Sequence, residues 1–158
     1  MEAVVTSVVA VVGTLLGAGI THFFQRQETE RSHALARDEK LRQERIDAYC
    51  AFAGTLLDYR RVLVHRWFVV HEDDGARCDE DTPELREEQY KTRYAAHEAM
   101  FRAQMVSDDA EVVELTERLL ADVTQLHWVE DRDELTELRA RTRQEIRDFV
   151  TAVARRVR

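Results

Sequence analysis

Hydrophobic residues are distributed along the chain in two different ways. From Ala3 to Gln25 the only ionisable side chain is His22, and the segment holds six valines, two leucines, an isoleucine and two phenylalanines. Beyond residue 25, apolar residues recur every three or four positions between charged ones, as in amphipathic helices. Only five glycines and one proline interrupt the whole chain. The sequence therefore predicts an all-α protein, in which an N-terminal transmembrane helix continues into a cytoplasmic antiparallel bundle of about four helices.

The apolar segment, residues 3–25, is predicted to be a membrane anchor. As a helix it would be about 34 Å long at about 1.5 Å per residue, which is enough to cross a hydrocarbon core of about 30 Å. A cleaved signal peptide would carry basic residues before its apolar core, but only Glu2 precedes this one and Arg26 and Arg31 follow it. A buried helix of a soluble protein is the other alternative. Because basic flanks stay in the cytoplasm, we expect a single-pass cell-membrane protein with its N-terminus outside and its C-terminal domain inside.

Two glycines within the anchor, Gly13 and Gly17, lie one helical turn apart in a G-x-x-x-G pattern. Such a pair allows the backbones of two membrane helices to approach closely, so both residues are candidates for self-association. Glycine is also common in membrane helices without any such role.

The remainder divides into a charged helical stalk, residues 26–45, and a helical bundle, residues 46–158. Apolar residues from Ile46 to Val70 form a stripe that Arg60 interrupts, and we expect this arginine either to pair with a buried acid or to extend outward. Cys50 lies in the same apolar run and is expected to be a small core residue. Net charge is −8 for the full chain, which does not favour direct nucleic-acid binding.

Three further helices are predicted after residue 82, each with one apolar face. The first begins at Pro83, with Thr82 as its N-cap, and is expected to bury an aromatic face. The second begins near Ser107–Asp109, where Glu111 follows Asp108 at the spacing of a capping box. The expected inward-facing residues are Tyr90, Tyr94, His97, Phe101 and Met105 in the first; Val112, Leu115, Leu119, Val123 and Leu126 in the second; and Leu135, Leu138, Ile146, Phe149, Val153 and Val157 in the third.

Few residues in this sequence indicate chemistry. The loop 71–83 holds six acidic residues, but its spacing matches no known cation-binding loop, so we expect it to be solvated. No nucleophile elbow, phosphate loop or zinc-binding spacing is present, and we expect no enzymatic activity, no cofactor and no metal site. Arg139, Arg143 and Arg147 recur at four-residue spacing on the last helix and are candidates for contact with phosphate or anionic lipid.

Parts of the sequence resemble a known family. The segments are Val11–Gly17 (VVGTLLG), Thr21–Arg26 (THFFQR), Leu41–Arg45 (LRQER) and Asp58–Arg61 (DYRR). They are similar to small actinobacterial membrane proteins described as KilB-like, after a plasmid-transfer (spread) protein of conjugative Streptomyces-type plasmids. The resemblance implies an integral membrane protein that assists intercellular plasmid spread without enzymatic activity.

The expected function is therefore that of a membrane-anchored interaction or scaffold protein. Its expected partners are the lipid bilayer, other copies of itself, and a further protein that the sequence does not identify. A membrane-active toxin or holin-like protein is the alternative.

Overall fold

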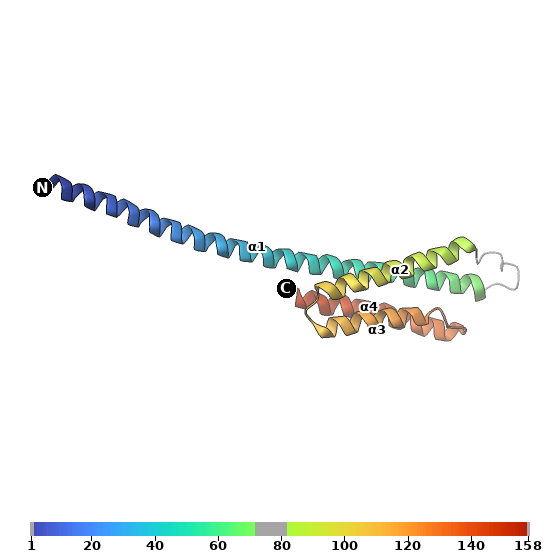
Figure 1. Ribbon diagram of the computed structural model, residues 1–158. Helices are drawn as coiled ribbons and strands as arrows, with labels where there is room; N and C mark the ends of the chain where they lie inside the picture. Colours follow the sequence, from blue (N-terminus) through green and yellow to red (C-terminus); the bar gives the residue numbers. More distant parts are fainter. Residues whose placement is uncertain (1, 72–81, 158) are drawn as a thin grey trace. The chain divides into compact units, whose positions relative to one another are not determined.

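In the computed structural model of this chain, the described residues form four α-helices (Figure 1). It describes the backbone of residues 2–71 and 82–157, and the side chains of residues 32–33, 35–71 and 82–157. The helices are α1 (Glu2–His71), α2 (Pro83–Val106), α3 (Ala110–Gln125) and α4 (Arg132–Arg156). The described backbone contains no strand, so the predicted all-α class is confirmed.

Contacts within the chain divide it into two units, residues 1–41 and 42–158. In the first unit, residues 2–41 belong to α1. The side chains of the predicted anchor, residues 3–25, lie outside the described set, and for Gly13 and Gly17 only the helical backbone is described. Within the residues whose side chains are described, no helix is both long enough and apolar enough to cross a bilayer.

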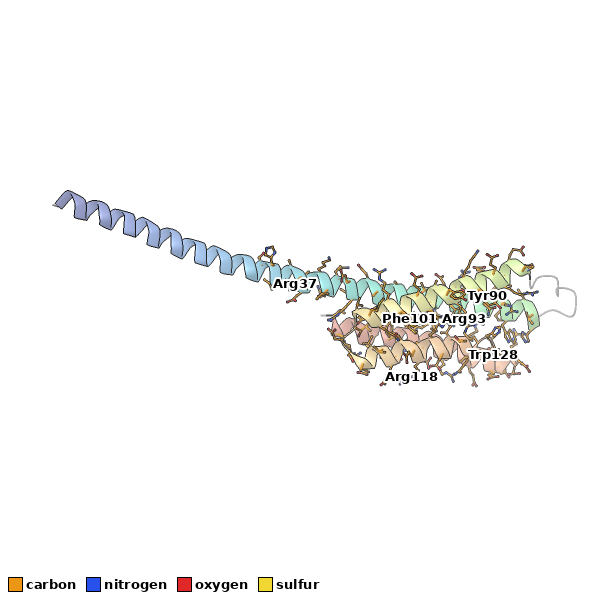
Figure 2. All side chains as sticks on the ribbon, in the orientation of Figure 1. Arg37, Tyr90, Arg93, Phe101, Arg118 and Trp128 are labelled. Atoms are coloured by element: carbon orange, nitrogen blue, oxygen red, sulfur yellow. The ribbon has the colours of Figure 1, made fainter. Side chains whose placement is uncertain are left out.

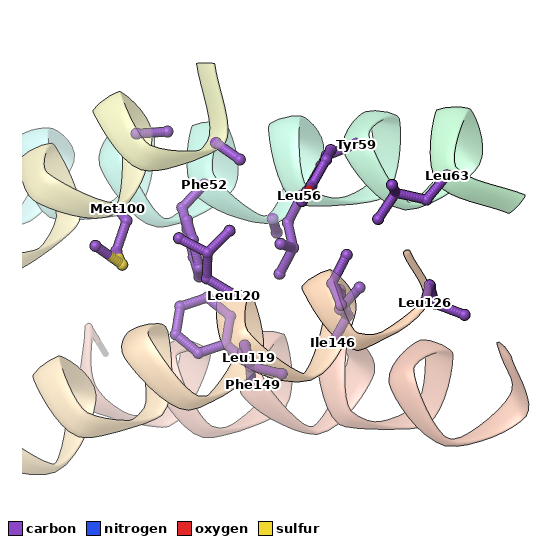
Figure 3. Close-up of a cluster of buried hydrophobic side chains, with 14 of the residues drawn as sticks. Phe52, Leu56, Tyr59, Leu63, Met100, Leu119, Leu120, Leu126, Ile146 and Phe149 are labelled. Atoms are coloured by element: carbon purple, nitrogen blue, oxygen red, sulfur yellow. The ribbon is translucent and has the colours of Figure 1, made fainter. Parts of the chain in front are cut away.

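The second unit is a four-helix bundle formed by the rest of α1 together with α2, α3 and α4. The connections 107–109 and 126–131 are short, which makes consecutive helices antiparallel neighbours. The four helices contribute to one hydrophobic core, as Figure 3 illustrates for part of it. Labelled there are Phe52, Leu56, Tyr59 and Leu63 of α1, Met100 of α2, Leu119 and Leu120 of α3, Leu126 just after α3, and Ile146 and Phe149 of α4.

Side chains at the helix starts satisfy backbone N–H groups that have no partner within the helix. Thr82 Oγ1 accepts from the N–H of Leu85 at 3.2 Å, and Pro83 follows as the first helical residue, as predicted. The cap of α3 is Asp109, whose Oδ1 accepts from the N–H of Glu111 at 2.9 Å. The predicted capping box through Asp108 is wrong by one residue, because the Asp108 carboxylate pairs with Arg45 of α1 instead.

The predicted apolar faces of α3 and α4 are confirmed. Thr142 occupies the position that lacks an apolar residue in the α4 stripe, and its buried hydroxyl donates to the Leu138 carbonyl at 2.8 Å. This bond allows a polar side chain in the core at little cost. The buried apolar residues of these two helices and their connection are Val112, Leu119, Leu120, Val123, Leu126, Val129, Leu135, Leu138, Ile146, Phe149 and Val153.

Helix α1 differs from its prediction at several positions, Cys50 and Val70 among them. Cys50 is exposed, not part of the core. It follows the buried Tyr49 by one residue, which on a helix is a rotation of about 100° away from the core. Further along, Trp67 is buried and donates from Nε1 to the Val129 carbonyl at 2.7 Å, whereas Val70 is exposed.

Candidate interaction surface

Helix α2 packs on the bundle with its small residues. Ala96, Ala99 and Ala103 are buried, together with Leu85 and Met100. Alanine adds only one methyl group beyond the backbone, so this contact buries little apolar area for its length. Apart from Leu85 and Met100, the large apolar residues of α2 lie elsewhere.

The aromatic face of α2, which was predicted to be buried, points to solvent. We call Tyr90, Tyr94, His97, Phe101 and Met105 the aromatic stripe. Four of its members have large exposed fractions: Tyr90 60%, Tyr94 75%, Phe101 54% and Met105 79%. The fifth, His97, is half-buried, and its Nδ1 lies 2.9 Å from the backbone oxygen of Arg93. The inward orientation expected for this stripe is therefore wrong.

The exposed apolar surface continues from α2 towards the end of α3. Trp128, in the connection between α3 and α4, is 75% exposed. Arg93 lines three adjoining depressions: one of about 340 Å³ with Tyr90, Tyr94 and Phe101, and two of about 470 and 430 Å³ with Trp128. Figure 2 labels Tyr90, Arg93 and Phe101 along α2, and Trp128 beyond α3. Exposed aromatic, methionine and arginine side chains are the composition typical of protein–protein interfaces.

A polar network lies beside this surface. Gln89 is buried; its Oε1 accepts from Arg66 Nη1 at 2.8 Å, and its Nε2 lies 3.2 Å from His127 Nδ1. Partial burial lowers the pKa of His127, and the nearby Arg66 and Arg93 lower it further. The neutral ring can then accept the Gln89 hydrogen bond through Nδ1. The network connects α1, α2 and the connection that follows α3, where the His127 ring contacts that of Trp128.

The basic residues predicted on α4 have unequal environments. Arg139 is half-buried; its guanidinium carbon lies 5.3 Å from the centre of the Phe68 ring, and its carbonyl accepts from Arg60 Nη2 at 2.6 Å. Arg143 and Arg147 are exposed. The structure therefore gives Arg139 a packing role, whereas phosphate or anionic-lipid contact by these arginines stays a prediction.

Arg60 follows neither of its two expected arrangements. It does not pair with an acid among the described residues, and it does not extend outward. Its Nε donates to Thr142 Oγ1 at 3.1 Å, and its Nη2 donates to the Arg139 carbonyl, so α1 is hydrogen-bonded to α4. Burial lowers the pKa of the Arg60 guanidinium, and the charges of Arg139 and Arg143 lower it further.

For Gly13 and Gly17, in the predicted anchor, the structure describes only the backbone, as part of α1. Of the acidic loop 71–83, residues 72–81 lie outside the described residues. Within the described part of the chain, no group of three or more histidine, cysteine or carboxylate side chains is arranged to hold a metal ion.

A comparison with protein-family models decides the family. The model of the KilB plasmid transfer protein matches residues 46–157, which is well over half of the chain. The chain belongs to the KilB plasmid transfer protein family. The family expected from the sequence is thus confirmed, but the matched region differs from the segments that suggested it. Of those segments, only Asp58–Arg61 lies inside the KilB match.

The KilB match covers nearly the whole bundle, including the aromatic stripe and Trp128. It begins at Ile46, the first residue of the apolar stripe predicted for the bundle, and ends at Val157. Comparisons with curated proteins and with solved structures gave no significant match.

Proposed function

We propose that this KilB-family protein is a non-enzymatic, membrane-anchored interaction protein that assists intercellular plasmid transfer. In this proposal the aromatic stripe of α2 is the surface through which the bundle contacts another protein. Residues 3–25 would hold the chain in the cell membrane, with the bundle on the cytoplasmic side.

The observation that carries the proposal is the orientation of α2. A helix that buries alanines and exposes Tyr94, Phe101 and Met105 leaves its more hydrophobic face in water. Burying a large apolar side chain contributes about 1.5–3 kcal/mol to folding stability. Stability of the single chain would therefore favour packing the aromatic stripe, rather than the alanines, against the bundle. Large apolar side chains kept on one exposed face are expected where a second protein covers them.

The family match supports the setting of this contact, because the model that matches is that of a plasmid transfer protein. The uninterrupted apolar segment supports the membrane anchor. Extraction of membranes with alkaline carbonate tests the anchor: an integral protein stays in the pellet, whereas recovery of the intact chain in the soluble fraction would contradict it.

The stripe is tested by plasmid transfer between cells that express single variants of the full chain. Phe101→Glu places a charge on the stripe, and Leu57→Glu places one on an exposed apolar position of α1, where the side chain is 45% exposed. Loss of a central interface residue costs at least about 2 kcal/mol, so we expect Phe101→Glu to lower transfer about tenfold or more. Leu57→Glu should transfer normally.

Both variants must reach the membrane in equal amounts for this comparison. Equal transfer by the Phe101→Glu and Leu57→Glu variants would show that the aromatic stripe has no part in the function.

A further inference from the structure

The aromatic stripe has a symmetry that indicates its partner. Tyr90 and Met105 are equally far from the point midway between His97 and Glu98, and Tyr94 and Phe101 are also equally far from it. An antiparallel copy of α2 laid against the stripe would therefore present large apolar side chains opposite large apolar side chains along the whole length.

We infer that the stripe binds the same stripe of a second copy of this chain, with α2 antiparallel to α2 about a two-fold axis between His97 and Glu98. This inference rests on the proposed function, of which it names the partner. In the pair, Tyr94 packs against Phe101 of the second copy, and Tyr90 packs against Met105 of the second copy. At the centre of the pair, His97 of each copy lies opposite Glu98 of the other copy.

The side chains favour the antiparallel arrangement over a parallel one. Antiparallel packing gives two tyrosine–phenylalanine contacts and two tyrosine–methionine contacts, both of which are favourable pairings. A parallel pair would instead place Glu98 beside Glu98 and Met105 beside Met105. Like charges at the same level of two packed helices are destabilising. Because a two-fold interface uses one patch twice, a self-complementary pattern is what such an interface requires.

The size of the contact fits a weak dimer. From Tyr90 to Met105 the stripe extends about 22 Å at about 1.5 Å per residue. Large side chains of about 150–250 Å², each more than half exposed, would bury on the order of 400–600 Å² per copy. The total of about 800–1,200 Å² lies near the lower limit for a specific interface.

Disulfide formation between two differently tagged full-length copies tests the pairing and its direction. Both native cysteines are first replaced, as Cys50→Ser and Cys78→Ser. One tagged copy then carries Tyr94→Cys and the other carries Phe101→Cys, and both are oxidised in membranes. A disulfide forms only when the two Cα atoms approach to about 4.4–6.8 Å, so an antiparallel pair yields the mixed disulfide between the two tags.

Two controls accompany the mixed pair. Leu57→Cys in both copies lies on exposed α1 surface and should give no disulfide. Adding Met105→Glu to both copies of the mixed pair should lower the cross-linked fraction about tenfold, since it charges the contact with Tyr90.

The outcomes separate this inference from the proposed function. A mixed disulfide supports the antiparallel pair. Disulfides only between copies with the same tag would overturn it in favour of a parallel pair. No disulfide, together with impaired transfer by Phe101→Glu, would overturn self-pairing and leave the stripe as a contact for a different protein. No disulfide and normal transfer would overturn both proposals.

Discussion

Glu145 on α4 is a carboxylate in an unfavourable environment, and its replacement by glutamine should stabilise the bundle. Its Oε2 is buried without a hydrogen-bond partner among the described residues, and its Oε1 lies 3.8 Å from Arg141 Nε. Partial burial raises the pKa of Glu145, and the nearby Asp122 raises it further, while Arg141 and Arg118 only partly oppose these effects. The ionised form is therefore less stable in the folded chain than in the unfolded one.

The sign of the pH dependence follows from the raised pKa. Below the pKa of the unfolded chain, about 4.3, Glu145 is protonated in both states and carries no penalty. As the pH rises through the unfolded and then the folded pKa, the folded state loses stability, and the full penalty is present above both values. Glu145→Gln removes the charge, so it should stabilise the protein at pH 7.5 and have little effect at pH 4.

The expected gain is modest because solvent reaches this residue. An unsatisfied buried polar group costs about 1–3 kcal/mol. Since the Glu145 side chain is 34% exposed, solvent screening reduces the gain from glutamine to about 0.5–1 kcal/mol. For a domain of this size, such a change raises the melting temperature by about 1–4 °C.

Thermal unfolding of the full chain in mild detergent, followed by circular dichroism at pH 4 and 7.5, measures this effect. Glu137→Gln, at an exposed position of the same helix, is the control and should change stability by less than about 0.5 kcal/mol at either pH. An unchanged or lower melting temperature of the Glu145→Gln variant at pH 7.5 would refute the reasoning. So would a rise of equal size at both pH values, because that would not depend on ionisation.

Three other predictions concern the core, a helix cap and the proposed anchor. Phe149→Ala should destabilise the bundle by about 3–5 kcal/mol in urea unfolding, because this buried ring meets Phe52 edge-on at 5.5 Å between centroids; a loss below about 1 kcal/mol would contradict the packing. Asp131→Ala should cost about 1 kcal/mol in thermal unfolding, whereas Asp131→Asn should cost less, since the carboxylate caps two N–H groups of α4. Gly13→Ile or Gly17→Ile should weaken association in a membrane dimerisation assay; unchanged association would exclude the anchor from self-association.

The inner faces of α3 and α4 could be predicted from the sequence because their pattern has one interpretation. Between Leu135 and Val153 most of the large apolar residues lie on one side, while charged residues predominate on the others; Val150, 45% exposed, is an exception. Only one orientation of such a helix buries the apolar area and leaves the charges in water. Leu135, Ile146 and Phe149 are accordingly buried.

The orientation of α2 could not be predicted in the same way, because this helix has two faces without charges in their centres. One carries alanines such as Ala96 and Ala103, and the other carries the aromatic stripe. Hydrophobicity favours burial of the aromatic residues, but the space left between α1 and α3 accommodates small side chains. Which face fits depends on the volumes of residues distant in the sequence, so the candidate surface could be recognised only after the bundle was assembled.

The hydrogen-bond partners of Arg60 could not be predicted from the sequence pattern either. A basic residue within an apolar stripe suggests a carboxylate partner, yet Arg60 donates to a backbone carbonyl and a threonine hydroxyl of α4. Backbone carbonyls are present at every position and leave no mark on the sequence. The family, by contrast, could be identified from short segments of the chain, although three of those four segments lie outside the matched region.

The two tryptophans of the chain occupy opposite environments, and this makes them intrinsic optical probes. Trp67 is 6% exposed and hydrogen-bonded to a carbonyl, whereas Trp128 is 75% exposed at the edge of the apolar surface. The emission of Trp67 should shift to longer wavelength only when the bundle unfolds. Iodide should quench Trp128 selectively in the folded chain, and a molecule that covers that edge should protect it, so occupancy and unfolding can be followed separately without an added label.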